Sequence, residues 1–245
     1  MSSPQEQISV IIPTLDERRA LPRALASATG IPNVEVIVAD GGSGDGTVEI
    51  ARDWGCRVIS TSAGRARQMN RGAEGSLSDY LVFLHADTRL PQGFEGGVRE
   101  TLTDPRVAAG AFQLRIDGAR GFLCLIEAGA NRRSRYLQMP YGDQAIFVRT
   151  ELFREVGGYP DLPIMEDFEL IRKLRRRGRI AVAPYSVLTS GRRWKDLGIL
   201  RTTLLNQIVV LAYLAGVQPT RIASWYRRAP GRVEHRNTSS MPPSG

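Results

Sequence analysis

Two short polar segments interrupt apolar stretches of the chain and could do chemistry. FLHADT places His85 and Asp87 directly after an apolar run, and MEDFEL supplies the adjacent acids Glu166 and Asp167. Such side chains cost free energy at the end of a buried strand unless they are solvated, paired or bound to a metal. Glu166 and Asp167 open a predicted helix, whose dipole stabilises negative charge. These segments are therefore the first candidates for metal binding and proton transfer.

A glycine-rich loop, DGGSGDGT at residues 40–47, is the next candidate. Its four glycines let the backbone approach a ligand closely and adopt positive φ. The loop has neither the GxGxxG spacing of a dinucleotide site nor the GK[ST] of a Walker-type ATP site. Asp40 could accept hydrogen bonds from a base edge, while Asp45 is expected to cap or form the turn into the helix that begins at Thr47.

The elements that must position these residues follow an alternating pattern. ISVII, VEVIVA, RVIST and YLVFL are typical of strands, and each is followed by a helical stretch. Continuous apolar strands separated by helices indicate a parallel sheet covered on both faces. Residues 8–104 therefore predict a doubly wound α/β unit. In such a sheet, ligands bind beyond the carboxyl ends of the strands, which is where PTLDE, DGGSGDGT and HADT stand.

After Pro105 the pattern becomes mixed. RVAAGAFQLRID alternates like an antiparallel strand, DQAIFV is another strand, and EDFELIRKLRRRG is a helix. We expect residues 105–195 to share the core of the first half and residues 196–230 to form a C-terminal helical segment, so that residues 1–230 make one domain. The Ser-, Pro- and Arg-rich residues 231–245 are expected to be disordered.

Five motifs occur in an order and spacing that resemble a known family. VIIPTLDE, VADGGSGDGT, GRARQMNRGA, FLHADT and MEDFEL are similar to motifs of the family 2 glycosyltransferases, over about residues 8–194, and to a small bacterial subgroup with the HAD(T) metal signature. The resemblance implies the GT-A fold, an α/β fold with a doubly wound, mostly parallel sheet and a mixed acceptor-side half. It also implies a nucleotide-sugar donor, a divalent metal and inversion at the anomeric carbon.

The resemblance further implies roles for individual residues. Asp87 is expected to bind Mn²⁺ or Mg²⁺, Asp167 to be the catalytic base, and Glu166 to orient the acceptor or the backbone. The expected nucleotide-sugar contacts are Pro13, Thr14, Leu15, Glu17, Asp40, Gly42, Arg67, Asn70, His85 and Ala86. The expected contacts to the acceptor or the donor sugar are Asp143, Gln144, Arg192, Arg193 and Trp194.

Two positions depart from the family pattern. His85 stands where an acid is common; it could contact ribose or diphosphate, favour Mn²⁺ because imidazole suits softer ions, or be a structural histidine. SGRRW resembles the family's QxxRW element but lacks its Gln, with Ser190 or a neighbour at that position. Trp194 could equally be a packed anchor for the arginines beside it.

The overall charge suits an anionic partner. The 245 residues carry a net charge of +8 and a pI of about 10.1, which fits a nucleotide diphosphate or an anionic membrane surface; we expect no nucleic-acid partner. Cys56 and Cys124 form no CxxC motif, and MSSPQEQ lacks the features of a signal peptide. A cytoplasmic location is therefore expected.

Residues 197–217 are rich in apolar side chains. Their uninterrupted part, from Ile208 to Val217, would span only about 15 Å as a helix, short of the ~30 Å core of a bilayer. We expect a helix that packs on the domain or on a second subunit as a homodimer. The alternative is peripheral contact with the inner face of the cell membrane, because Arg221, Arg227 and Arg228 favour anionic headgroups.

Two other functions compete with sugar transfer. A nucleotidyltransferase would carry a Lys-containing, Gly-rich signature near the first strand, and VIIPTLDERRA contains no Lys. A non-catalytic nucleotide-binding scaffold would not need Asp87 and Asp167 together. The sequence therefore predicts a hexosyltransferase-like, inverting, metal-dependent enzyme that moves a sugar from a UDP-sugar to an unidentified hydroxyl acceptor, such as a lipid or polysaccharide precursor.

Overall fold

The computed structural model describes residues 6–192 and 198–228. The chain divides into two compact units, residues 1–191 and residues 192–245. The first unit ends four residues before the boundary that we expected at residue 195. That residues 1–230 make one domain stays a prediction. Residues 231–245, which we expected to be disordered, lie outside the described residues.

The first unit is built on an eight-stranded sheet with the order β3-β2-β1-β4-β7-β6-β8-β5. The strands are β1 (Ile8–Thr14), β2 (Val34–Asp40), β3 (Arg57–Ser60), β4 (Tyr80–Phe83), β5 (Thr88–Arg89), β6 (Val107–Ile116), β7 (Phe147–Arg149) and β8 (Arg179–Thr189). Strands β1 to β4 are parallel, as the apolar runs predict. The predicted α/β architecture with a mostly parallel sheet is confirmed.

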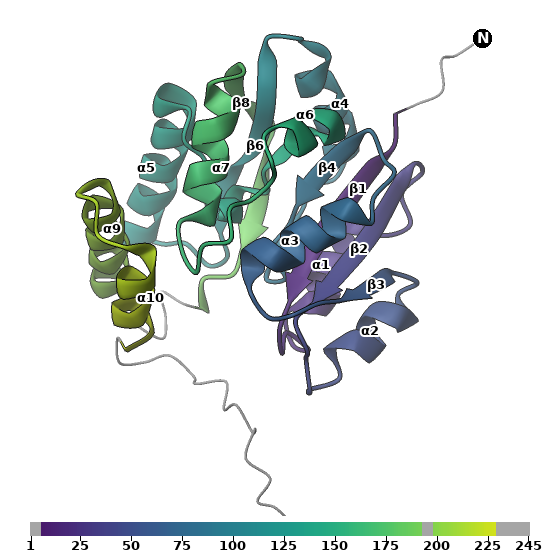
Figure 1. Cartoon of the computed structure of the whole chain (residues 1–245), viewed down its shortest axis with the longest axis horizontal. Coiled ribbons are helices and arrows are strands. Elements are labelled where there is room, and N and C mark those ends of the chain that lie inside the picture. Colours follow the sequence, from purple (N-terminus) through teal and green to yellow (C-terminus); the bar gives the residue numbers. More distant parts are fainter. Residues whose placement is uncertain (1–5, 193–197, 229–245) are drawn as a thin grey trace, which may run out of the picture. The chain divides into compact units, whose positions relative to one another are not determined.

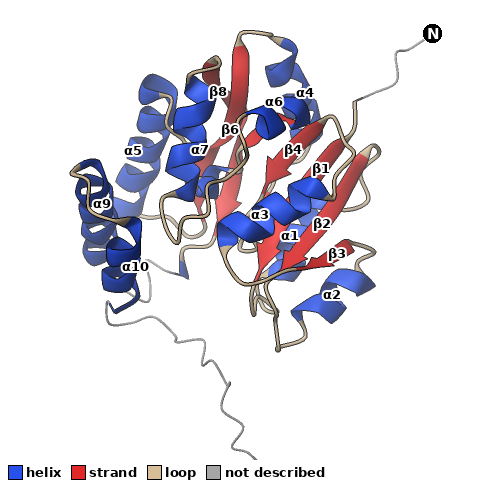
Figure 2. Cartoon of the chain, in the orientation of Figure 1, coloured by secondary structure: helices blue, strands red, loops and turns tan. Residues whose placement is uncertain are grey.

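Helices cover the sheet on both faces (Figure 2). They are α1 (Leu21–Ala28), α2 (Thr47–Asp53), α3 (Arg65–Glu74), α4 (Phe94–Thr103), α5 (Phe122–Leu137), the 3₁₀ helix η1 (Gly142–Gln144), α6 (Thr150–Glu155) and α7 (Glu166–Arg175). Helix α3 lies across β1 and β2, with α1 behind them (Figure 1). A Cβ at Gly72 would stand 2.5 Å from Ile11 Cγ2, so only glycine lets α3 approach β1 this closely.

The prediction for β6 was right about the strand and incomplete about its neighbours. Strand β6 pairs antiparallel with β7 over Ala109 and Gly110, but it runs parallel to β8 along most of its length. The alternation of side chains does not determine the direction of a neighbouring strand, which depends on how the chain returns to the sheet. The mixed half predicted for this region is therefore present, with β7 as its antiparallel member.

Aromatic packing connects the sheet to the segment before α7. The ring of Phe83, at the end of β4, lies 4.9 Å from the ring of Tyr159 and 5.0 Å from that of Phe153. All three side chains are buried in the main core with Leu170 and Leu174 of α7. Burial of this apolar surface is the main favourable term that holds the ends of β4 and α7 near each other.

The described part of the second unit includes the helices α9 (Ile199–Leu214) and α10 (Pro219–Arg228). The hydroxyl of Tyr226 donates a 3.4 Å hydrogen bond to Asn206 Oδ1 and so joins the two helices. None of the helices among the described residues has the length and hydropathy needed to cross a bilayer, which agrees with the length estimate for this segment. Contact with a membrane surface and packing on a second subunit both stay predictions.

Candidate active site

The candidate site begins where β1 and β2 end side by side. Thr14 and Asp40 are register partners in these parallel strands, and Thr14 Oγ1 donates a 3.1 Å hydrogen bond to Asp40 Oδ1. Asp40 Oδ2 accepts hydrogen bonds from the backbone N–H groups of Gly42 (2.8 Å) and Ser43 (2.9 Å). Asp40 is only 2% exposed, and its carboxylate stabilises the loop that follows β2. A contact to a base, as the sequence predicted, would require one of these bonds to be exchanged.

Gln68 on α3 ties the two strand ends together, a role that the sequence did not reveal. Its Nε2 donates to the carbonyl oxygens of Thr14 (2.6 Å) and Ala39 (2.9 Å). Gly41 packs against this amide, because a Cβ there would stand 3.1 Å from Gln68 Nε2. The sequence signal for this role of Gln68 was its position in GRARQMNRGA, a motif with many polar residues. Asp45 accepts the backbone N–H of Thr47 at 3.0 Å, the turn-forming role that we expected.

The centre of the site is Gly142 in η1. Its backbone N–H donates a 3.1 Å hydrogen bond to Asp167 Oδ2. A Cβ at this position would overlap Asp167 Oδ2 and would stand 2.8 Å from His85 Nε2. The side chains of Asp167, at the start of α7, and His85, just before β5, therefore converge on one glycine, and the space between them depends on the missing Cβ.

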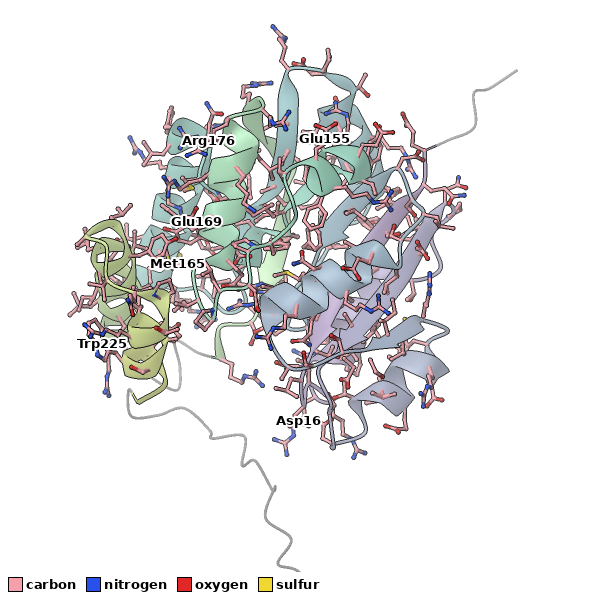
Figure 3. All side chains as sticks on the ribbon, viewed as in Figure 1. Asp16, Glu155, Met165, Glu169, Arg176 and Trp225 are labelled. Carbon is pink, nitrogen blue, oxygen red and sulfur yellow. The ribbon has the colours of Figure 1, made fainter. Side chains whose placement is uncertain are left out.

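Arg65 brings a positive charge to the same place. Its Nε lies 2.7 Å from Glu166 Oε1, and its Nη1 lies 3.5 Å from His85 Nε2. The Glu166 side chain is 3% exposed, whereas that of Arg65 is 46% exposed. Met165, just before α7, has a left-handed backbone with φ of 71°, a conformation that is strained for a residue with a side chain. Met165 and Arg176 mark the two ends of α7 in Figure 3.

The charges around Asp167 shift its protonation. Burial and the neighbouring Glu166 carboxylate raise the pKa of Asp167 to about 7, against the charge of Arg65 and the Gly142 hydrogen bond. Burial and the charge of Arg65 lower the pKa of His85 to about 3, so its ring is neutral. Among residues 6–192 and 198–228, the buried Asp167 Oδ1 and the Tyr159 hydroxyl have no hydrogen-bond partner. An acid poised near pH 7 with one oxygen unused suits general-base chemistry.

Asp87 and Asp143 form the second acidic part of the site. Burial raises the pKa of Asp143, and the charge of Asp87 raises it further, against the charge of Arg133. Asp143 Oδ1 is buried without a hydrogen-bond partner in the described ranges. Two carboxylates that disfavour each other's charge fit a divalent cation, whose preferred ligands are oxygen atoms.

The protein supplies only part of a metal ligand set. In the part of the chain that the structure describes, no group of three or more His, Cys, Asp or Glu side chains is placed to hold a metal. The remaining ligands would have to be water and donor oxygens. The segment that carries Asp87 is fixed by β8, since Ser190 N donates to the Asp87 carbonyl oxygen at 3.1 Å and the hydroxyls of Thr88 and Thr189 lie 3.0 Å apart.

Residues 9–152 match the family described as Glycosyl transferase family 2. The chain belongs to glycosyltransferase family 2. It is 38% identical over 94 residues to the 4,4'-diaponeurosporenoate glycosyltransferase of Staphylococcus haemolyticus, covering 35% of this chain and 25% of that protein. The chain thus spans about a quarter of the length of this curated relative.

Solved structures show the same fold. TarS from S. aureus in complex with UDP-GlcNAc aligns with a TM-score of 0.61 at 17% identity, over 76% of this chain and 59% of that chain. The mannosyltransferase PcManGT from Pyrobaculum calidifontis, with GDP-Man and Mn²⁺, aligns with a TM-score of 0.60 at 20% identity, over 76% of this chain and 57% of that chain. The GT-A fold that the resemblance implied for this family 2 member is confirmed.

Two residues of α3 that we expected to contact the donor make contacts within the protein, and their role toward a donor stays a prediction. Arg67 pairs with Asp161, and its Nε lies 2.9 and 3.0 Å from the two carboxylate oxygens. Arg65, two residues earlier, is the arginine that reaches Glu166. Asn70 clamps Tyr159: its Nδ2 donates to the Tyr159 carbonyl oxygen at 2.8 Å, and its Oδ1 accepts the Tyr159 N–H at 2.9 Å. Its amide is used by the backbone and has a structural role.

Gln144, which we expected to contact the acceptor or the donor sugar, makes its hydrogen bonds within the protein, and the expected contact stays a prediction. Its side chain is fully buried. Its Nε2 donates to the Phe112 carbonyl oxygen at 3.0 Å, and its Oε1 accepts from Ser134 Oγ at 2.6 Å. Arg133, which the sequence did not single out, lies beside it with its guanidinium 3.6 Å from the Tyr141 ring centroid. Of the neighbours Asp143 and Gln144, only Asp143 interacts with the charge of Asp87.

The remaining predicted residues fall into two groups. Pro13, Thr14, Leu15, Glu17 and Gly42 lie at the ends of β1 and β2 and in the loops that follow them, and Ala86 lies between His85 and Asp87 with 5% exposure. Arg192 begins the second unit. Arg193 and Trp194 lie outside the described residues. The roles assigned to all of these residues stay predictions.

Proposed function

We propose that this family 2 member is an inverting, metal-dependent glycosyltransferase that moves a sugar from a nucleotide-sugar to a hydroxyl acceptor, with a UDP-sugar as the first donor to test. The observation that carries the proposal is the environment of Asp167. One of its oxygens is held by the Gly142 N–H, the other is buried without a partner among the described residues, and its pKa is raised to about 7.

The reaction needs a base on the acceptor side. Asp167 Oδ1 would take the proton of the acceptor hydroxyl as the acceptor oxygen forms its bond to the anomeric carbon and the bond from that carbon to the diphosphate oxygen breaks. Because attack and departure occur on opposite sides of the carbon, the configuration inverts. Gly142 holds Asp167 Oδ2 through its backbone N–H and so leaves Oδ1 to face the acceptor.

Glu166 and Asp167 have different tasks in this proposal. Successive residues of a helix point about 100° apart, so the two carboxylates cannot serve the same proton. Glu166 is buried in its ion pair with Arg65, which leaves Asp167 for the acceptor. The neutral ring of His85 can contact ribose or diphosphate without adding charge to the site.

The donor side needs counter-charge for the leaving diphosphate. Asp87 would hold Mn²⁺ or Mg²⁺, with Asp143 facing the same space. When bound, the cation would stabilise the negative charge that develops on the leaving nucleoside diphosphate. Support comes from PcManGT, whose structure holds GDP-Man and Mn²⁺, and from TarS, whose structure holds UDP-GlcNAc.

A ligand screen followed by a transfer assay tests the proposed function. UDP, GDP, ADP and their sugar conjugates should be compared by thermal shift with and without Mn²⁺, because a ligand that binds the folded state raises Tm by mass action. We expect a UDP compound to raise Tm most, and only with the metal present. Equal effects of UDP, GDP and ADP would count against a uridine donor. Release of nucleoside diphosphate that depends on an added acceptor then reports transfer itself.

A further inference from the structure

An ion pair connects the starts of two helices that are far apart in the sequence. Arg65 is the first residue of α3 and Glu166 is the first residue of α7, and their Nε and Oε1 atoms are 2.7 Å apart. Glu166 is only 2% exposed, so its charge is costly without a partner. The ion pair with Arg65 is what compensates the burial of Glu166 Oε1.

The same guanidinium reaches the centre of the site. Arg65 Nη1 lies 3.5 Å from His85 Nε2, and His85 meets Asp167 at Gly142. Partial desolvation lowers the pKa of Arg65, but the charges of Glu166, Asp167 and Asp143 outweigh it and raise that pKa. Arg65 therefore stays cationic and is placed to act on Asp167 through its charge as well as through Glu166.

Helix geometry makes the direction of Asp167 depend on that of Glu166. Adjacent helical residues point about 100° apart, so a Glu166 fixed toward Arg65 sends Asp167 toward Gly142. The left-handed backbone of Met165 marks where α7 begins, directly before Glu166. Moving Glu166 would therefore move Asp167.

We propose that Arg65 is the positioning residue of Asp167: its ion pair with Glu166 fixes the first turn of α7, and its charge favours the ionised form that accepts a proton. This inference rests on the proposed function, in which Asp167 is the base. It assigns to Arg65 a role that neither the sequence motifs nor the family match gives it.

The charge balance at Asp167 determines the sign of the expected effect. Glu166 and Asp143 favour its protonated form, whereas Arg65 and the Gly142 N–H favour its ionised form. The other titratable groups that face it are the Tyr159 hydroxyl and the His85 ring, both uncharged at neutral pH. Removing the Arg65 charge must therefore make Asp167 hold its proton more tightly.

The test is a ¹³C-carboxyl NMR titration of Asp167, assigned with Asp167→Asn. In Arg65→Gln we expect the apparent pKa of Asp167 to rise by about 1 or more, the usual effect of losing a close opposite charge. Arg65→Lys keeps the charge and should restore most of the wild-type value. Arg71→Gln is the matched control, because Arg71 lies on the same helix and pairs at the surface with Glu74; it should change nothing.

A double variant covers the case in which Arg65→Gln does not fold. Glu166→Gln removes the buried charge, and Arg65→Gln combined with Glu166→Gln removes both partners, which is milder than leaving one buried charge unpaired. Asp167 should have a higher pKa in the double variant than in Glu166→Gln alone. The same value in both would overturn the proposal.

The titration needs neither donor nor acceptor, so it separates this proposal from the proposed function. A pKa of Asp167 that does not change in Arg65→Gln refutes the role of Arg65, whatever the activity. If the pKa rises and the wild type transfers no sugar from any donor, the proposed function fails and the charge relationship holds. In an active enzyme, the acid limb of the kcat/KM profile should move to higher pH in Arg65→Gln while nucleotide affinity by calorimetry stays within about twofold. Lost nucleotide affinity with an unchanged pH profile would make Arg65 a donor contact and would overturn the proposal.

Discussion

The N–H of Gly142 donates a hydrogen bond to Asp167 Oδ2 at 3.1 Å, and the missing Cβ of Gly142 leaves room for that carboxylate beside His85. Gly142 and Asp167 are 25 positions apart in the sequence, and η1 brings them together. Asp167 Oδ1, on the other side of the carboxylate, is buried with no hydrogen-bond partner in the described residues. The acid is thus held by one oxygen, while the other makes no hydrogen bond to a described residue.

Asp167→Asn should separate catalysis from folding. Asparagine is also a good residue at a helix start, so donor affinity should be kept while the transfer rate falls by about 10² to 10⁴, the usual contribution of a positioned base. The measurement is turnover beside nucleotide affinity. Near-normal turnover would mean that another acid, such as Glu166 or Asp143, takes the proton.

The same variant should be more stable than the wild type at high pH. Because the pKa of Asp167 rises from 3.8 to about 7 on folding, the folded state binds more protons between these values, and stability is lost as the pH rises through 7. Asparagine carries no such charge. We expect the Tm of Asp167→Asn to exceed that of the wild type by about 3 °C or more at pH 8.5. At pH 5 the difference should be less than half as large, because most of the loss occurs between pH 5 and 7; an equal difference at both pH values would contradict the assignment.

The pH dependence of transfer should have an acid limb with its midpoint near 7, because Asp167 must be ionised to accept the proton. Glu166→Gln removes the negative charge that raises this pKa, so its midpoint should move to lower pH. Initial rates of kcat/KM between pH 5 and 9 give both values. A midpoint near 4 in the wild type would show that the pKa of the base is not raised as the burial of Asp167 and the charge of Glu166 require.

Gly142→Ala should disturb the site through one methyl group. Its Cβ would overlap Asp167 Oδ2 and crowd His85 Nε2, so Asp167 must move, and a misplacement of about 1 Å can cost roughly 10²-fold in rate. Gly129→Ala on α5 is the control, because a Cβ at Gly129 meets nothing within 4 Å. The control should keep its turnover and be slightly more stable. Full activity of Gly142→Ala would exclude close packing at this position.

Asp87→Ala should abolish metal-dependent nucleotide binding and leave the fold intact. The segment around Asp87 is held to β8 through the Asp87 backbone carbonyl and through Thr88, which the substitution preserves. Calorimetry with UDP and Mn²⁺ gives the affinity, and circular dichroism gives the fold. Unchanged Mn²⁺-dependent affinity would rule out Asp87 as a metal ligand.

The second unit is predicted to bring the enzyme to an anionic membrane surface where a lipid-linked or amphipathic acceptor lies. Leu204, Ile208, Leu211 and Leu214 of α9 are exposed apolar side chains, and Arg201 and Arg221 are exposed as well. Co-sedimentation with anionic vesicles should exceed that with neutral vesicles and fall as salt is raised. If the protein binds no vesicle at low salt, packing on protein is the remaining explanation for these side chains.

Much of the fold could be predicted because its signals are local. The apolar runs at β1, β2 and β4 are continuous, and a parallel sheet gathers the loops that follow such strands at one edge. This rule was sufficient to place PTLDE, DGGSGDGT and HADT together from the sequence alone. This rule could not predict that β6 pairs with β8, because the alternation of side chains within one strand contains no information about the neighbouring strands.

Tertiary structure decided which of several chemically similar residues reaches the site. Arg65 and Arg67 differ by two helical positions, about 200° around the axis, and only the packing of α3 on β1 and β2 determines that Arg65 meets Glu166 while Arg67 meets Asp161. Asp143 and Gln144 are adjacent in the sequence, yet Asp143 interacts with the charge of Asp87, whereas Gln144 is fully buried against β6. The protonation of Asp167 depends on burial and on charges that the fold brings from α3, η1 and α7. Residue type and spacing therefore determined the kind of chemistry, and long-range packing determined which side chains can perform it, because distance and burial in space set electrostatic energies.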